Sequence, residues 1–225
     1  MDYQALATDY DGTIATKGKV EKSTYLALKR WQETGRKLIM VTGRRLDNLY
    51  DIFPEVATFD CIVAENGALI SFPTENKTIL LGETPPNSLI EALQKRQVEP
   101  LFIGQSIIST WVHNSQSTEE VIAELDLSWQ VNLNKHTVML LPEGVDKYSG
   151  LKTALSQMDL TPEQVVGVGD GENDIPLLKL SGLSVSVANA LPMLKDCSDW
   201  IMTKNSGDGV AELIDKLLGS GNYSL

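Results

Sequence analysis

Residues 5–13 read Ala5-Leu6-Ala7-Thr8-Asp9-Tyr10-Asp11-Gly12-Thr13, an apolar stretch followed by two aspartates one residue apart and a Gly-Thr turn. Because successive side chains of a strand point to opposite faces, Asp9 and Asp11 share one side as long as the chain stays extended. Two carboxylates held that close repel each other unless a cation or a shared proton lies between them. The pattern predicts a magnesium site in which one aspartate also attacks a phosphoryl group. On these residues alone, a solvated acidic turn is an equal alternative.

The composition is that of an ordinary soluble globular protein, with 225 residues, 42% apolar and 22% charged. This length fits one large domain, or a core with a small insert. The net charge of −11 argues against nucleic-acid and anionic-membrane partners, because both would be repelled. A phosphorylated substrate would be repelled as well, so its site needs local positive charge and a metal.

Two features concern the cellular compartment. Cys61 and Cys197 are the two cysteines and lack metal-ligand spacing, so we expect unpaired thiols in a reducing cytosol. The first residues, Met1-Asp2-Tyr3-Gln4, have no basic or apolar signal region, and no window approaches 18 apolar residues. The sequence therefore predicts a cytoplasmic protein.

Strands alternate with helices through both ends of the chain, and the strands are apolar without a break. Such strands are typical of a parallel sheet covered by helices on both faces. We expect these strands at 4–10, 37–42, 61–64, 165–169, 183–187 and 200–203, and helices at 23–34, 46–53, 147–157, 174–180 and 210–218. A hairpin is expected from residues 67–72 and 77–81.

The stretch between Glu83 and Gly144 has a different pattern, in which paired strands alternate with helices. We expect helices at 87–96 and 118–125, and strands at 101–103, 107–113, 129–133 and 137–141. This pattern indicates a small antiparallel α+β module. The predicted fold is therefore α/β, with a Rossmann-like parallel core (1–83 and 145–225) and an inserted αββαββ cap domain (84–144).

Polar residues follow several of the expected core strands. They are Asp9 and Asp11, Thr42-Gly43-Arg44, and Asp170-Gly171-Glu172-Asn173-Asp174. Ligands bind outside the carboxyl ends of the strands in open parallel sheets, so these groups are expected to converge. Lys147 opens the helix after the insert and supplies a cation that could reach the same place.

Each residue type suits one task in phosphoryl transfer. Asp9 and Asp170 offer hard oxygen ligands for Mg²⁺, and Asp11 can protonate a leaving oxygen and then deprotonate a water. Thr42 and the Gly43 N–H can hold phosphate oxygens. Lys147 can neutralise developing charge.

Each piece also has an ordinary alternative when taken alone. Thr42-Gly43-Arg44 can be a strand-to-helix turn, Lys147 a solvated charge, and residues 170–174 a loop with a helix cap. Arg44, Arg45 and Asp47 can simply pair on the surface. These alternatives require four coincidences in one chain order, so the joint pattern favours a phosphoryl-transfer site.

The four segments together resemble the four motifs of the haloacid dehalogenase superfamily, and the match covers the core from end to end. The insert resembles the class IIB cap of Cof-like and sucrose-phosphatase-like phosphatases, in the small form of archaeal-type phosphoglycolate phosphatases. The resemblance implies that Asp9 is a nucleophile forming an aspartyl-phosphate and that Asp11 is the general acid and base.

The resemblance also implies a ligand set. Mg²⁺ would be held by the side chains of Asp9 and Asp170 and by the backbone carbonyl of Asp11. Asp174 would hold it directly or through another ligand. Asn173 would help to hold the substrate phosphate. Glu65-Asn66-Gly67-Ala68 resembles a further family segment, in which we favour a structural turn at Asn66 over ligand binding.

Two expected cap strands carry polar faces, formed by Ser109, Trp111 and His113 and by Ser128, Gln130, Asn132 and Asn134. These faces could contact a leaving group, but we favour a solvated face of a half-buried sheet. Trp111 and Trp129 are interpreted as core residues. No role is assigned to His113 or His136.

The predicted function is therefore a Mg²⁺-dependent phosphatase for a small phosphorylated metabolite, of the phosphoglycolate or sugar phosphate type. The alternatives are a phosphomutase or phosphotransferase, and a non-catalytic module that binds phosphate esters. We expect a monomer or homodimer without nucleic-acid or membrane partners.

Overall fold

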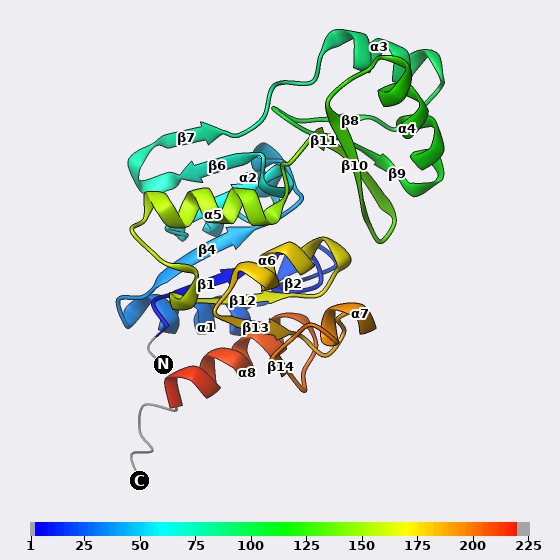
Figure 1. The fold of residues 1–225 in the computed structure, drawn as a ribbon. Coiled ribbons are helices and arrows are strands. Elements are labelled where there is room, and N and C mark those ends of the chain that lie inside the picture. Colours follow the sequence, from blue (N-terminus) through cyan, green and yellow to red (C-terminus); the bar gives the residue numbers. More distant parts are fainter. Residues whose placement is uncertain (1–2, 220–225) are drawn as a thin grey trace.

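An eight-stranded sheet forms the core of the protein, in the order β14-β13-β12-β1-β4-β5-β6-β7 (Figure 1). The computed structural model describes residues 3–219. All neighbours from β14 to β5 are parallel, and β6 and β7 continue the sheet as an antiparallel hairpin. The strands are β1 (Ala5–Thr8), β4 (Lys37–Val41), β5 (Cys61–Ala64), β6 (Leu69–Phe72), β7 (Lys77–Leu80), β12 (Val165–Gly169), β13 (Leu183–Ser186) and β14 (Trp200–Ile201).

Helices cover both faces of this sheet, as the unbroken apolar strands require. The helices α5 and α6 pack against β5 and β12 on one face, and α1 packs against α8 and β4 on the other (Figure 1). These core helices are α1 (Lys22–Glu33), α2 (Leu46–Ile52), α5 (Lys147–Gln157), α6 (Ile175–Leu180), α7 (Pro192–Lys195) and α8 (Ser206–Gly219).

The helix α1 shows how the sequence makes one such contact. Ala27, Leu28 and Trp31 are buried at a spacing of one helical turn. The Trp31 indole N–H donates to the Lys37 carbonyl at 2.9 Å, which fixes the helix to the start of β4. Gly35, with φ of +83°, allows the turn between the two elements. The helix begins at Lys22, after the N-cap residue Glu21 and one residue before the expected start at 23.

The insert folds as a second sheet, antiparallel throughout, in the order β10-β11-β9-β8. Two helices cover its outer face and share an apolar cluster with it that includes Leu93, Val121 and Trp129. The elements are α3 (Asn87–Lys95), β8 (Phe102–Ile103), β9 (Ile108–Trp111), α4 (Ser115–Glu124), β10 (Trp129–Asn134) and β11 (Thr137–Pro142). The predicted αββαββ cap on a Rossmann-like core is confirmed, while its limits at 84 and 144 stay a prediction.

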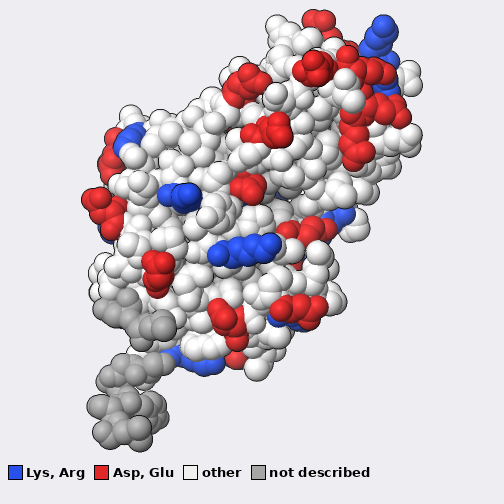
Figure 2. Space-filling view, in the orientation of Figure 1, with Lys and Arg blue, Asp and Glu red and all other residues white. Residues whose placement is uncertain are grey.

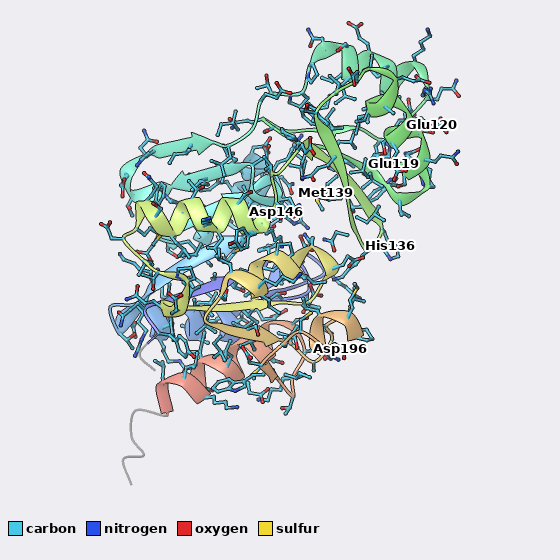
Figure 3. All side chains as sticks on the ribbon, viewed as in Figure 1. Glu119, Glu120, His136, Met139, Asp146 and Asp196 are labelled. Atoms are coloured by element: carbon cyan, nitrogen blue, oxygen red, sulfur yellow. The ribbon has the colours of Figure 1, made fainter. Side chains whose placement is uncertain are left out.

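The inner face of the cap is turned toward the core. Ile107, Met139 and Leu141 from the cap pack with Ala68 and Val145 of the core in a small apolar cluster. Figure 3 labels Met139 and Asp146 where the two lobes meet, and His136 at the tip of the hairpin β10–β11. This hairpin extends toward the carboxyl ends of the core strands.

Several short elements were not predicted. A small hairpin pairs β2 (Ala15–Thr16) with β3 (Lys19–Val20), and α7 follows β13. Single 3₁₀ turns lie at Pro54–Thr58, Glu65–Gly67, Pro73–Glu75, Val112–Asn114, Pro162–Gln164 and Glu172–Asp174.

Several expected strands are shorter than predicted, and for two of them the structure shows why they end early. The first ends at Thr8 because the Tyr10 carbonyl turns back and accepts from the amides of Thr13, Ile14 and Ala15. The expected strand 107–113 ends at Trp111, because residues 112–114 form a 3₁₀ turn. His113 therefore leaves the face that alternation had given it.

Both cysteines have free thiols, as predicted. Cys61 is buried and Cys197 is exposed. Acidic side chains gather on the cap in Figure 2, where Glu119, Glu120 and Glu124 are exposed on α4. Among residues 3–219, no helix combines the length and hydropathy needed to cross a bilayer. The frayed tail expected after Gly219 lies outside the described residues.

Candidate active site

A buried lysine lies between two buried aspartates at the carboxyl ends of the strands. The Lys147 ammonium donates to Asp9 Oδ1 at 2.6 Å and to Asp174 Oδ1 at 2.6 Å. Lys147 is 0% exposed and Asp9 6% exposed. The interpretation of Lys147 as a solvated charge is therefore wrong, and the predicted convergence of these three residues is observed.

The start of α5 aims Lys147 at this place. Asp146 caps the helix, because its carboxylate accepts from the Ser149 amide at 2.8 Å while its own amide donates to Ser149 Oγ at 2.9 Å. Gly150 lets the helix approach the core, since a Cβ there would lie 2.5 Å from the Cα of Gly67. The helix end and its ammonium are thereby fixed against the sheet.

The loop after β12 is held by one of its own carboxylates. Asp174 Oδ2 accepts from the amides of Asp170 and Gly171, both at 2.9 Å. Its other oxygen binds Lys147, so both oxygens have partners. A Cβ on Gly12, which has φ of +85°, would lie 2.1 Å from Asp170 Oδ2, so this turn requires glycine.

Three carboxylates form a cluster of suitable size for one cation. Asp9, Asp170 and Asp174 are all buried and offer ligand atoms within 4.8 Å of one another. Burial and the neighbouring Asp174 and Asp170 together raise the pKa of Asp9 to about 8, against the opposing effect of Lys147. Burial also raises the pKa of Asp170, partly offset by a hydrogen bond from Lys135. The cluster therefore carries more negative charge than Lys147 and Lys135 neutralise.

Lys147 keeps its proton in this setting. Burial alone lowers its pKa, but Asp174 and Asp9 reverse that effect and leave the pKa raised. The ammonium is therefore a permanent positive charge beside the Asp9 carboxyl group.

Asp11 lies outside the three-carboxylate cluster and pairs with Arg44. Arg44 Nε donates to Asp11 Oδ2 at 2.6 Å and Nη2 donates to Oδ1 at 2.8 Å, a bidentate pair. Arg44 is held in turn by Asn48 Oδ1 at 2.8 Å and lies over the Tyr10 ring. The expected surface pairing of Arg44 thus proves to be a half-buried contact with a candidate catalytic residue.

Thr42 and Gly43 lie where β4 ends, beneath the cap. Thr42 is buried, and its hydroxyl accepts from the Arg44 amide at 3.1 Å. A Cβ on Gly43 would lie 3.2 Å from the Met139 sulfur and 3.9 Å from Asn173 Nδ2. Glycine therefore keeps its backbone open to whatever occupies the space between core and cap.

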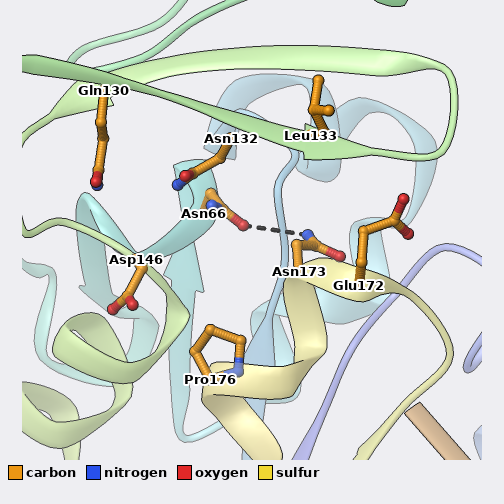
Figure 4. Close-up of a pocket in the computed structure, with 8 residues that line it drawn as sticks. All are labelled: Asn66, Gln130, Asn132, Leu133, Asp146, Glu172, Asn173 and Pro176. Carbon is orange, nitrogen blue, oxygen red and sulfur yellow. Dashed lines mark hydrogen bonds between the residues drawn. The ribbon is translucent and has the colours of Figure 1, made fainter. Parts of the chain in front are cut away.

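Asn173 and Asn66 meet across this space. Asn173 Nδ2 donates to Asn66 Oδ1 at 3.1 Å (Figure 4). Asn66 has the predicted turn conformation, with φ of +54°, and its amide donates to the Thr42 carbonyl at 2.9 Å. Its side chain also lines a cavity, so Asn66 both forms the predicted turn and is placed where a ligand could be contacted.

Glu65, next to Asn66, ties the cap to the core. Its carboxylate is buried and accepts from the amides of Gln105 at 3.0 Å and Ser106 at 2.8 Å. Burial raises its pKa although the two amides oppose this. The sequence identified residues 65–68 by a family resemblance but did not predict the contact of Glu65 with the cap.

The polar face of β10 does not point to solvent, so the favoured interpretation is wrong for Gln130 and Asn132. Both line the cavity above Asn66, because they pair with Leu141 and Met139 and share the inward face of the cap with them. Alternation correctly grouped these residues. It could not tell which side of the sheet faces the core.

The two cap tryptophans differ. Trp129 is buried, as predicted, and its indole N–H donates to Glu83 Oε1 at 2.9 Å. Trp111 is 44% exposed and meets Phe102 edge to face, so its interpretation as a core residue is wrong.

Lys135 and Asn189 are site residues that the sequence reasoning missed. Lys135 occupies the turn between β10 and β11, and its ammonium donates to Asp170 Oδ2 at 2.7 Å. The Asn189 amide donates to the Gly12 carbonyl at 2.9 Å. The Asn134-Lys135 pair marks a turn in the sequence, but only the placement of the cap brings Lys135 to the cluster.

Comparison with known proteins gives three kinds of similarity. A family model described as haloacid dehalogenase-like hydrolase matches residues 6–127 and 105–214. Phosphoglycolate phosphatase 2 of Saccharolobus solfataricus is 30% identical in an alignment of 229 positions, which covers 97% of this chain and 93% of that protein. A phosphoglycolate phosphatase of Methanothermobacter thermautotrophicus is 28% identical, and the alignment covers 96% of this chain and 99% of that protein.

Solved structures share the whole architecture. A haloacid dehalogenase-like hydrolase from Bacteroides thetaiotaomicron superimposes with a TM-score of 0.84 at 20% identity, over 96% of this chain and 100% of that chain. A HAD subclass IIB sugar phosphatase gives a TM-score of 0.78 at 18% identity, over 96% and 99% of the two chains. At these identities the similarity concerns the fold of core and cap together.

Proposed function

Because this chain belongs to the haloacid dehalogenase-like hydrolase family and is a phosphatase, we propose that it hydrolyses the phosphate monoester of a small metabolite through an aspartyl-phosphate, with Mg²⁺. The observation that carries the proposal is the buried ammonium of Lys147 between Asp9 and Asp174. It supplies the positive charge that a phosphate needs beside an anionic nucleophile in a chain of net charge −11.

Asp9 is the proposed nucleophile. One of its carboxylate oxygens attacks phosphorus, forming a new O–P bond while the bond from phosphorus to the leaving oxygen breaks. Asp11 gives its proton to that leaving oxygen, after exchanging its contact with Arg44 for one with the substrate. In the second half, Asp11 takes a proton from water as the water attacks phosphorus and restores the Asp9 carboxylate.

The residues around Asp9 are assigned to holding the phosphoryl group. We assign its oxygens to contacts with Thr42, the Gly43 amide, Lys147 and Asn173. Their donors would stabilise negative charge as it develops on these oxygens.

The three buried carboxylates Asp9, Asp170 and Asp174 fit a hard divalent cation, because they are oxygen ligands within 4.8 Å of one another. We propose that they hold Mg²⁺, together with the backbone carbonyl of Asp11. Bound Mg²⁺ would reduce the repulsion between the Asp9 carboxylate and the phosphoryl oxygens. Lys135 contacts Asp170 Oδ2 at 2.7 Å, so an ion bound at that oxygen would replace its ammonium.

The direct test is release of p-nitrophenol from p-nitrophenyl phosphate, with and without Mg²⁺. We expect turnover only with the metal and its loss in Asp9→Asn. Asp196→Asn, an exposed aspartate remote from the site (Figure 3), is the matched control and should behave as the unchanged protein. Metal-independent turnover would overturn the proposal.

Two further outcomes separate the alternatives. Transfer of phosphate to an added sugar alcohol faster than to water would indicate a phosphotransferase. Calorimetric binding of phosphate esters without turnover would indicate a binding module. We also expect a cytoplasmic location and a monomer or homodimer, to be checked by cell fractionation and by light scattering.

A further inference from the structure

The tip of the cap hairpin reaches the carboxylate cluster of the core. Lys135 and His136 form the two-residue turn between β10 and β11, and the label of His136 marks this tip in Figure 3. The Lys135 ammonium donates to Asp170 Oδ2 at 2.7 Å, and the Lys135 amide donates to Glu172 Oε1 at 3.0 Å. One residue of the cap thus makes two contacts with the loop that carries a proposed metal ligand.

The backbone at Lys135 is unusual for a lysine. Its φ is +54°, in the left-handed region that glycine adopts at little cost and that residues with a Cβ adopt rarely. Residues held in such conformations are concentrated at functional sites. The side chain that this turn presents is the one that contacts Asp170.

The charges in the cluster decide when this ammonium has a partner. Without a metal, the ammonium groups of Lys147 and Lys135 face the three carboxyl groups of Asp9, Asp170 and Asp174. Mg²⁺ would add two positive charges, so that four positive charges would face at most three negative ones. At separations of a few ångströms this excess is unfavourable, and one ammonium is expected to leave.

Lys135 is the cation that can leave. Lys147 is 0% exposed, and two carboxylates hold it at the start of a helix. The Lys135 side chain is 37% exposed and lies on a flexible stem at a turn. Once its ammonium is released, only the bond from its amide to Glu172 remains of its two contacts with the core. The hairpin tip would then be held less firmly.

A bound phosphoryl group reverses this balance. A phosphate monoester brings about two negative charges, so the negative charges then outnumber the positive charges of Mg²⁺ and Lys147. Lysine is a common phosphate ligand that acts as a point charge. The Lys135 ammonium therefore has a partner in the loaded site as well, although a different one.

We propose that Lys135 is a cation supplied to the active site by the cap, which binds Asp170 without metal, is released by Mg²⁺, and returns to contact the substrate phosphoryl group. The cap hairpin is thereby held on the core in the empty and in the fully loaded site, and is loosened between these states. This inference rests on the proposed function. It adds Lys135 as a substrate-binding residue that also positions the cap.

The Lys135 amide reports on this contact, because it donates to Glu172. We would follow its hydrogen exchange by NMR in the metal-free protein, with Mg²⁺, and with Mg²⁺ and inorganic phosphate. Exchange should be about tenfold faster with Mg²⁺ alone and return to the slow rate with phosphate. In Lys135→Met it should be fast in all three states. Equal exchange in all three states of the unchanged protein would overturn the proposal.

Mg²⁺ affinity gives a second measure, because coupling between two contacts is reciprocal. If Mg²⁺ weakens the Lys135 contact about tenfold, that contact must weaken Mg²⁺ binding by the same factor. Calorimetry should therefore show about tenfold tighter Mg²⁺ binding in Lys135→Met. At saturating Mg²⁺, KM for p-nitrophenyl phosphate should rise in this variant, since a phosphate contact is lost. An unchanged Mg²⁺ affinity would equally contradict the proposal.

Two further variants isolate the ammonium from other effects. Lys135→Gly suits the positive φ, so it should lose both responses without disturbing the turn. Lys95→Met removes the same charge from an exposed position of α3 in the cap and should keep both responses. Their loss in Lys95→Met would assign them to net charge and overturn the role of Lys135. Exchange and calorimetry need no turnover, so an inactive but responsive protein would count against the proposed function alone.

Discussion

At the scale of single residues, the site depends on one buried cation, Lys147, that two carboxyl groups share. Lys147 contacts both Asp9 and Asp174, and its removal would leave two buried carboxyl groups without the cation they share. Breaking a buried pair by removing one partner costs about 3–5 kcal/mol, because the remaining charge is uncompensated. The sequence identified Lys147 by chain order and not by environment, since burial of a lysine cannot be inferred from its neighbours in the chain.

The raised pKa of Asp9 has a consequence for metal binding. In the metal-free protein this pKa is about 8, so the carboxyl group is largely protonated at lower pH. Mg²⁺ requires the ionised form and therefore competes with the proton. We expect the Mg²⁺ affinity to fall as the pH drops below 8, by up to about tenfold per unit.

Isothermal titration calorimetry from pH 6 to 9, in buffers of different ionisation enthalpy, would measure both the affinity and the protons released. Asp9→Asn should bind Mg²⁺ more weakly and lose the part of the pH dependence that comes from Asp9, leaving the part that comes from Asp170. An affinity that stays constant between pH 6 and 8 in the unchanged protein would contradict this assignment.

At the scale of elements, the sequence located the core strands and helices well where a single signal dominated. The predicted ranges 61–64, 147–157 and 165–169 coincide with β5, α5 and β12. The helix α8 begins four residues earlier than expected, at Ser206. Glycine in this added turn serves close packing, since a Cβ on Gly207 would lie 2.1 Å from Thr24 Oγ1.

The same reasoning explains what the sequence could not show at the site. Residues that follow strands of a parallel sheet must converge, so the positions of Asp9, Thr42 and Asp170 were predictable. Gln130 and Lys135 belong to the cap, and their contribution depends on which face of a separate sheet meets the core. No local pattern encodes that choice.

The close approach of α5 to the core can be tested at Gly150. In Gly150→Val, the new side chain would meet the Gly67 backbone, with Gly67 Cα 2.5 Å from the Cβ position. Because backbone cannot move aside cheaply, we expect a loss of about 1–3 kcal/mol in the free energy of unfolding. The displaced helix should also misplace Lys147 and lower kcat by more than the stability loss explains.

Urea unfolding and steady-state kinetics would separate the two effects. Ser156→Ala, at an exposed position of the same helix, is the control and should change neither quantity appreciably. A Gly150→Val protein with unchanged kcat would show that the helix position is not critical.

At the scale of the whole molecule, core and cap form two separate apolar clusters joined by a small third one and by polar contacts. Glu65 accepts two backbone amides of the cap, and Arg45 Nη1 donates to the Ile103 carbonyl at 2.9 Å. Such contacts are limited in number, so each of them contributes strongly to holding the cap on the core.

Glu65→Gln tests this connection. The glutamine keeps one acceptor oxygen but loses the charge, and hydrogen bonds to a charged group contribute about 1.5–3 kcal/mol each. We expect the amides of Gln105 and Ser106 to exchange with deuterium about tenfold faster, while the amides of β12 keep their protection.

Hydrogen exchange read by mass spectrometry would resolve these segments. Glu119→Gln, on the exposed side of α4, provides the control and should leave both segments unchanged. Equal protection of residues 105–106 in Glu65→Gln and the unchanged protein would mean that Glu65 does not hold the cap.

The position of β1 in the central sheet also governs how the protein is made. This strand pairs with β4, which follows soon after it, and with β12, which is synthesised only after the entire cap. Until residue 165 has left the ribosome, one edge of this buried strand has no neighbour and can pair with other chains. Nascent molecules of this protein therefore pass through a long aggregation-prone stage, and chaperone supply is expected to limit their yield more than the stability of the finished fold.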